Sequence, residues 1–122
     1  MNTAVAPEIA TAIAQARRWY WQRISAMVLA LCVLVHLAIM IYAVRGGLSA
    51  VEILDRTRGN WGFAAFYSVF VVACAVHVPV GLTNIAQEWW GLHERHALWL
   101  ARAFAVVLLA AGLRAVYAVV AG

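Results

Sequence analysis

A histidine, a glycine, an asparagine and a glutamate are spaced so that they fall on one face of an otherwise apolar helix. They are His77, Gly81, Asn84 and Glu88, the last three at offsets of 4, 7 and 11 residues from the histidine. At about 100° per residue, the four positions lie within a stripe about 60° wide. An imidazole in such a segment needs a polar partner, which can be a metal ion, a carboxylate, or a hydroxyl or carbonyl group on another helix.

The stripe supports two interpretations of His77. In the first, His77 hydrogen-bonds a neighbouring helix and Gly81 is a packing glycine. In the second, His77 is an axial ligand of a haem iron, and Gly81 leaves room for the edge of the porphyrin because it has no side chain. Pro79 frees the carbonyl of Ala75 and is expected to bend the helix beside the histidine. Periodicity alone does not separate the two interpretations.

A second histidine repeats the spacing in the preceding apolar segment. Ser25 and His36 are eleven residues apart and therefore share a face. Because consecutive spans run in opposite directions, we expect Ser25 at the same membrane surface as Glu88, and His36 at the depth of His77. Two such histidines could ligate one haem from both sides. The simpler expectation for His36 is a hydrogen bond to a backbone carbonyl.

The composition is that of a membrane protein. The chain has 122 residues, of which 66% are hydrophobic and 11% charged, and a soluble domain this small could not bury so much apolar surface. Residues 24–44 and 62–87 carry no charge, and residues 103–122 carry only Arg114. Each stretch approaches or exceeds the ~20 residues that a membrane span needs.

We therefore predict an all-α membrane protein: three transmembrane helices with a short N-terminal amphipathic interfacial helix, forming a single membrane-anchor domain over residues 1–122. The interfacial helix covers about residues 7–21, and the transmembrane helices cover about residues 22–44, 61–90 and 98–120. The polar connection after the first span has room for one helical turn around residues 51–54.

All nine basic residues are arginines, and they gather at the ends of the predicted spans, where they anchor against lipid headgroups. Their positions do not resemble a nucleic-acid-binding surface with interleaved aromatic residues. Five of the nine share a side with the N-terminus. Weighting the first span most, we expect a cytoplasmic N-terminus.

Two segments and a third span together resemble the small membrane-anchor subunits of succinate dehydrogenase (complex II) and fumarate reductase. The segments are QRISAMVLALCVLVHL and HVPVGLTNIAQEWW. The shared features are R-x-S/T-A opening the first span, a histidine with glycine four residues later in the second, and an acid and an aromatic residue eleven and twelve residues after that histidine. The likeness runs from about Trp19 to the C-terminus. The QRISA stretch is similar to the smaller, cytochrome b type of hydrophobic anchor.

The resemblance implies residue roles. His77 would be the axial ligand of the iron of haem b, and Glu88 and Trp89 would border the ubiquinone pocket. The resemblance also places Arg23 near the haem propionates or the quinone. Gly81, from its helix face, and Arg102, from its place near the cytoplasmic surface, are further haem-binding candidates, although headgroup contact also accounts for Arg102. His36 has no counterpart in a single-haem anchor, so it is a candidate ligand only if a second haem is present. The quinone-site residues that the resemblance implies are Ser25, Arg23, Glu88 and Trp89. This family usually has Asp-Tyr at the last two positions, and an indole can donate one hydrogen bond but cannot accept one.

The resemblance also implies partners. The chain would be non-catalytic alone and would join a second anchor subunit, an iron–sulfur subunit and a flavoprotein subunit in the bacterial inner membrane, where electrons pass from succinate to quinone. Two alternatives stay open. One is a haem-free structural anchor; the other is a small helical subunit of a transporter in which His77 and Glu88 form a proton relay.

Overall fold

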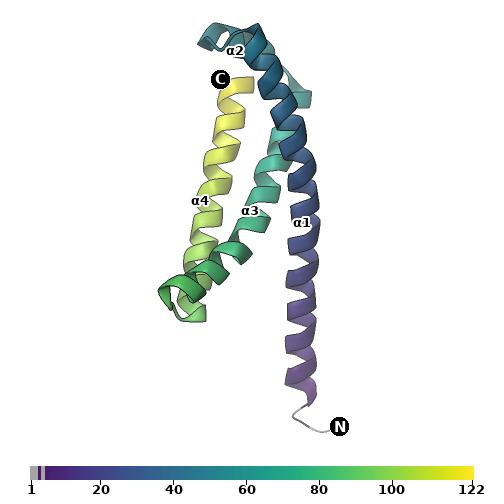
Figure 1. Cartoon of the computed structure of the whole chain (residues 1–122), viewed down its shortest axis with the longest axis vertical. Helices are drawn as coiled ribbons and strands as arrows, with labels where there is room; N and C mark the ends of the chain where they lie inside the picture. The colour runs from purple at the N-terminus through teal and green to yellow at the C-terminus, as the bar shows by residue number, and fades with distance from the viewer. Residues whose placement is uncertain (1–2, 4) are drawn as a thin grey trace.

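The computed structural model describes residue 3 and residues 5–122, and the fold is all-α (Figure 1). Its helices are α1 (Val5–Gly46), α2 (Ala50–Thr57), α3 (Trp61–Trp90) and α4 (Glu94–Val120). Helices α1, α3 and α4 are each long and apolar enough to cross a membrane. The predicted all-α architecture with three potential spans is confirmed.

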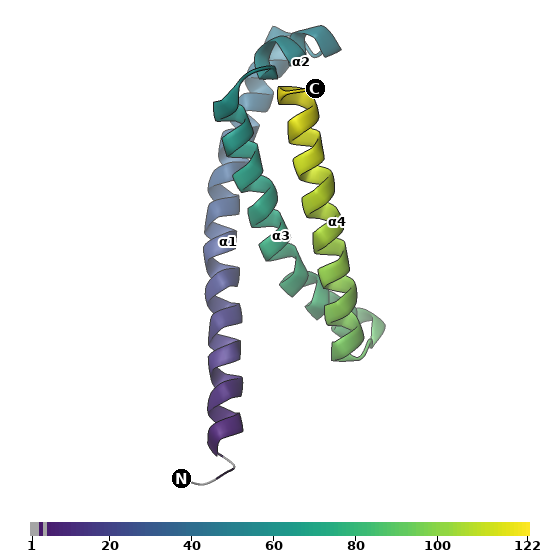
Figure 2. The ribbon, with the colours of Figure 1, turned by 180° about the vertical axis from the view of Figure 1, so that it is seen from behind.

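Helix α1 is one uninterrupted helix of 42 residues. The predicted interfacial segment, residues 7–21, is helical, but it is not a separate element because it continues directly into the first span. The sequence explains the continuity, since no glycine or proline occurs between Pro7 and Gly46. The N-terminal part of α1 extends past the connection between α3 and α4 in both views (Figures 1 and 2).

Helix α2 forms where one helical turn was expected and is longer than that turn. Ser49 caps it: the Ser49 hydroxyl accepts from the Glu52 backbone N–H at 3.3 Å, and the Glu52 carboxylate accepts from the Ser49 backbone N–H at 2.9 Å. Gly47 precedes the cap with φ of 103°, and a Cβ at this position would collide with the Glu52 carboxylate. The tight turn out of α1 therefore needs glycine here.

The C-terminal end of α2 is fastened to the end of α4. The Thr57 hydroxyl donates to the Val119 carbonyl at 2.8 Å, and the Gly59 backbone N–H donates to the Val120 carbonyl at 2.9 Å. Both acceptors belong to the last turn of α4, where carbonyls lack partners within the helix. These two bonds hold the α1–α3 connection against the C-terminus of the bundle.

Helices α3 and α4 form a close hairpin. Gly91 ends α3 in the left-handed conformation, with φ of 62°, and its N–H bonds back to the last turn. On α4, a Cβ at Gly112 would lie 2.6 Å from Val71 Cγ1, so the glycine allows the two helices to approach. Most buried apolar positions of this hairpin are alanines: Ala73, Ala86, Ala97 and Ala101, with Val120 at the end of α4.

Helix α3 crosses the space between its two neighbours. It begins beside α1 at the α2 end of the molecule and ends beside the start of α4 (Figures 1 and 2). Pro79 lies inside α3, and the Thr83 hydroxyl bonds to the Pro79 carbonyl at 2.7 Å. The half of α3 that carries Glu88 consequently lies away from α1, whereas the half before it packs against α1.

Candidate functional site

His77 has a hydroxyl partner on α1. The His77 Nδ1 atom lies 3.3 Å from the Ser25 Oγ atom, and Ser25 is buried, with 4% of its surface exposed. The same hydroxyl donates its only proton to the Gln22 carbonyl at 3.1 Å. The hydroxyl must then accept from the imidazole, so this pattern places a proton on Nδ1. In the neutral ring, that arrangement leaves the lone pair on Nε2.

The helix surface one turn beyond His77 is open. A Cβ built at Gly81 would meet no atom of the described chain within 4 Å. The glycine that packs one helix of this chain on another is Gly112, not Gly81. The surface beside the histidine is therefore accessible to a ligand or to a partner subunit.

One buried polar atom near this pair lacks a partner. The Gln22 amide oxygen is inaccessible to solvent and has no hydrogen-bond partner among the described residues. Gln22 lies one turn before Ser25, so the unpaired acceptor belongs to the same part of α1 as the hydroxyl that orients His77. Most buried polar atoms in folded proteins are hydrogen-bonded, so this oxygen marks a place in α1 where the hydrogen bonding is incomplete.

His36 has a different partner at a different depth. The His36 Nδ1 atom lies 2.9 Å from the Tyr67 hydroxyl oxygen. The His36 ring also lies edge-on to Phe70, with ring centroids 5.8 Å apart, and Phe70 stacks on Tyr67. His36 is thus enclosed by an aromatic cluster on α3, and its partner is a side-chain hydroxyl rather than the expected backbone carbonyl.

The expected register of the first two spans is wrong. His36 was expected at the depth of His77, but Ser25 is the residue of α1 that lies beside His77. The two histidines are separated by about 16 Å along the helices. The expectation failed because Ser25 and His36, like His77 and Glu88, are eleven residues apart. Sliding α1 by three turns therefore preserves the helical phase, and two registers fit the pattern equally well.

The predicted quinone-site residues are not gathered within this chain. Glu88 and Trp89 lie at the exposed end of α3, about 16 Å along the helix from His77 and Ser25. Trp89 is 79% exposed. Over this distance a proton cannot pass directly between Glu88 and His77, so a relay between them would need intermediate groups.

The two arginines of the predicted site are also exposed. The Arg23 guanidinium lies 5.4 Å from the centroid of the Trp19 ring, a cation–π contact. Arg23 and Ser25 are two positions apart, which is about 200° around the helix, so the two side chains leave nearly opposite sides of α1. Arg102 is exposed on α4. Neither arginine is brought to His77 by the fold of this chain.

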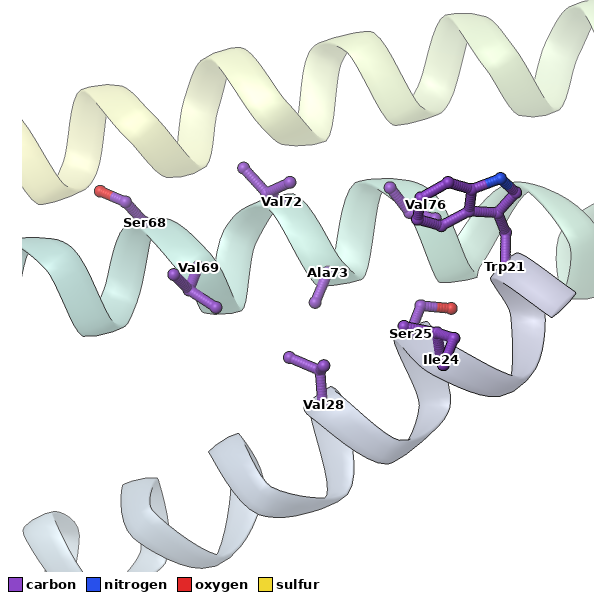
Figure 3. Close-up of a pocket in the computed structure, with 9 residues that line it drawn as sticks. All are labelled: Trp21, Ile24, Ser25, Val28, Ser68, Val69, Val72, Ala73 and Val76. Carbon is purple, nitrogen blue, oxygen red and sulfur yellow. The ribbon is translucent and has the colours of Figure 1, made fainter.

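A small apolar cavity adjoins Ser25. It has a volume of about 360 Å³ and lies between α1 and α3 (Figure 3). Ser25 and Val28 on α1 face Ala73 on α3, and the Trp21 side chain reaches toward Val76. The cavity can accept an apolar group beside the Ser25–His77 pair.

The described residues do not form a metal site by themselves. Within residues 5–122, no three side chains of the His, Cys, Asp or Glu type converge. A metal ion at His77 would therefore take its other ligands from a macrocycle or from another chain. That requirement fits haem, which takes only its axial ligands from protein.

Tyr67 and the orphaned oxygen of Gln22 were not predicted from the sequence. Tyr67 had a usable signal, because a tyrosine hydroxyl inside an apolar span needs a hydrogen-bond partner. His36 is the titratable residue of the adjacent span that could supply it. Gln22 had no such signal, because whether its amide oxygen is paired depends on the packing of the finished fold.

No protein-family model matches this chain, and neither curated proteins nor solved structures gave a significant match. Function is therefore inferred from the residues, from their geometry, and from the motif resemblance.

Proposed function

We propose that this chain is the smaller membrane-anchor subunit of a succinate:quinone oxidoreductase, binding haem b through His77 and contributing to a ubiquinone site. Its place would be the bacterial inner membrane, with the N-terminus in the cytoplasm. The observation that carries the proposal is the bonded chain from Gln22 through Ser25 to His77.

This bonded chain prepares the imidazole for iron. Histidines that bind metals usually donate the second ring N–H to an acceptor, which fixes the tautomer and the ring orientation. Ser25 is such an acceptor for Nδ1 of His77, and the assigned tautomer leaves Nε2 as the ligating atom. The open surface at Gly81 gives a planar group room one turn away. The residues present therefore fit a haem, which when bound would supply a one-electron carrier.

The second axial ligand and the electron donor would come from partner subunits. The other anchor subunit would bring a ligand to the open side of α3, and the iron–sulfur subunit would cover the exposed end that carries Glu88 and Trp89. Exposed aromatic residues at the end of a span suit either a membrane interface or a covering protein. Arg23 and Arg102, both on the N-terminal side, would supply cations for propionates or for a reduced quinone headgroup.

Glu88 and Trp89 would then meet quinone at the junction with the iron–sulfur subunit. Trp89 can donate one hydrogen bond from its indole N–H, and Glu88 can accept or donate a proton. Ser25 lies deeper, so in this proposal it acts through His77 and the small apolar cavity rather than beside Glu88.

The Ser25–His77 bond also favours a second candidate function, a haem-free structural anchor. In that case the hydroxyl alone satisfies the imidazole, and the bond joins α1 to α3. Hydrogen bonds between membrane helices contribute about 0.6 kcal/mol on average, so this role is sufficient to retain the pair.

A reduced-minus-oxidised optical spectrum of the purified complex separates the two candidates. The wild-type complex should show b-type haem bands, and His77→Ala should abolish them. His36→Ala is the matched control, because it removes the other imidazole that joins α1 to α3, about 16 Å away along the helices, and the bands should persist. Wild-type protein without haem bands, or bands that survive His77→Ala, would contradict the haem assignment.

A further inference from the structure

A larger cavity lies at the opposite end of α1 from the N-terminus. It has a volume of about 810 Å³, is open on one side, and is lined by the last turns of α1, by α2 and by the first turns of α3. Most of its lining is apolar, including Val35, Ile39, Met40, Leu48, Ile53 and Phe63. Neither histidine-based proposal above uses this volume, so it calls for an occupant of its own.

One cation stands at the outer end of this cavity. Arg56 of α2 is a lining residue, is half-buried, donates to the Gly47 carbonyl, and lies 6.0 Å from the centroid of the Tyr42 ring. Among residues 5–122, no carboxylate forms a salt bridge with Arg56. The nearby Glu52 carboxylate is hydrogen-bonded to Ser49, and the Arg56 charge attracts it without a direct contact. The guanidinium has five N–H donors, so it retains donors for an anion.

At the inner end of the cavity, the polar side chains are hydrogen-bonded to each other. His36 and Tyr67 line it, and their mutual hydrogen bond satisfies one polar atom of each side chain. Phe63 and Phe66 lie around them. His36 lies ten residues before the end of α1, so the cavity extends about 15 Å from the α2 end into the membrane region.

We propose that this cavity binds one anionic phospholipid. Its phosphate would accept hydrogen bonds from Arg56 at the outer end, and an acyl chain would lie along the apolar walls toward the aromatic inner end. The Arg56 guanidinium, which forms no salt bridge among the described residues, favours a negative headgroup, and the apolar depth favours a long hydrocarbon chain. Because three helices of the chain are membrane-spanning in length and composition, a bilayer lipid is the amphiphile at hand.

Other occupants fit the lining less well. A nucleotide would leave its base and ribose against apolar walls without hydrogen-bond partners. A free phosphate would bind Arg56 but would leave the apolar part of the cavity empty. The inference depends on neither haem nor quinone, so it can fail or stand independently of the proposed function.

The test measures lipid binding to the full chain, purified in mild detergent with any subunits that accompany it. After delipidation, native mass spectrometry would follow titration with phosphatidylglycerol and with phosphatidylcholine of the same acyl chains. We expect tighter binding of phosphatidylglycerol, and about a fivefold loss of that affinity in Arg56→Gln. Arg58→Gln is the matched control, because it removes an exposed arginine from the same connection and should bind as the wild type does.

Two further variants keep the test decisive if Arg56→Gln perturbs α2. Arg56→Lys preserves the charge and should retain most of the phosphatidylglycerol affinity. Ile39→Trp fills the apolar part of the cavity and should lower the binding of both lipids. Equal binding of the two lipids by wild-type protein would overturn the proposal, as would an equal loss in Arg58→Gln. Glycerol phosphate that binds as tightly as phosphatidylglycerol would also overturn it, because the site would then recognise the anion alone.

Discussion

The two histidine–hydroxyl pairs occupy the same two helices, yet their surroundings differ. His36 bonds the bulky Tyr67, and its ring is packed edge-on against aromatic neighbours at 5.8 Å. His77 bonds the small Ser25, and the helix surface one turn away is open. The difference shows that a hydrogen bond does not by itself define the role of a membrane histidine. The two pairs differ in the space beside the imidazole, which aromatic rings fill at His36 and which is open at Gly81, one turn from His77.

The largest effect is expected at the Ser25–His77 pair, from a side chain that fills the open helix surface at Gly81. On the proposed haem assignment, Gly81→Leu should lower haem content to a small fraction of the wild-type value, because the side chain would enter the space that the porphyrin edge would need. The fold should persist, since a Cβ at Gly81 meets nothing within 4 Å. Pyridine haemochrome analysis gives haem content, and circular dichroism checks helicity. Gly62→Leu, at the start of α3, is a control; full haem content in Gly81→Leu would refute the assigned surface.

Removing the orienting hydroxyl should have a smaller effect. Ser25→Ala leaves His77 in place but releases Nδ1, and loss of such an orienting partner typically costs 10–100-fold in metal affinity. Haem should therefore dissociate faster from Ser25→Ala, as measured by transfer to apomyoglobin. Ser68→Ala is the matched control, since Ser68 lines the same small cavity without contacting His77. If the two variants lose haem at the same rate, Ser25 does not orient the imidazole.

At the His36–Tyr67 pair, the expected effect is on the stability of the fold rather than on ligand binding. Tyr67→Phe removes the hydroxyl that bonds His36 while preserving the aromatic packing, and the loss should be about 0.5–1.5 kcal/mol. Unfolding in a denaturing detergent measures the change. Phe66→Leu serves for comparison, because it alters packing without touching the bond. If Tyr67→Phe lost haem, the His36–Tyr67 pair would belong to the haem site, and the contrast with the Ser25–His77 pair would no longer hold.

The smallest effect concerns α2, which lines the larger cavity together with the His36–Tyr67 pair. Hydrogen bonds from the Ser49 side chain and backbone lower the pKa of Glu52 below its ordinary value. A lowered carboxyl pKa stabilises the folded state above the unfolded value of about 4.3, and that contribution is lost as the pH falls through the folded pKa.

Acidification below about pH 4 should therefore lower the protection of the α2 amides, relative to their intrinsic exchange rates at the same pH, before it affects α3. Hydrogen exchange followed by mass spectrometry measures this, with Glu52→Gln expected to remove most of the pH dependence. An unchanged pH profile in Glu52→Gln would show that another group controls the cap.

The spans were predictable because charge-free runs of sufficient length have few alternatives in so apolar a chain. The short helix α2 was also within reach, since polar residues and glycines frame a single hydrophobic turn. The continuity of α1 was missed because Arg17 and Arg18 interrupt the hydrophobic pattern without interrupting the helix. Charged side chains end a membrane span, but only a backbone effect such as proline or glycine ends a helix.

The site was predictable in its faces but not in its register. Helical phase correctly placed Ser25 and His36 on one face, and His77 and Gly81 on another. It could not choose which residue lies opposite which, because the eleven-residue spacing occurs on both helices. A hydroxyl count would have helped: Tyr67 also needs a partner, and one register satisfies both histidines at once.

The unbroken backbone of α1 has a mechanical consequence. At about 1.5 Å per residue, its 42 residues form a rod of about 63 Å, roughly twice the thickness of the bilayer's hydrocarbon layer. No hinge separates the part in lipid from the part beyond it. A 10° change in the tilt of the rod would sweep a tip about 30 Å outside the membrane sideways by about 5 Å. Anything resting on that tip would sense movements made inside the bilayer.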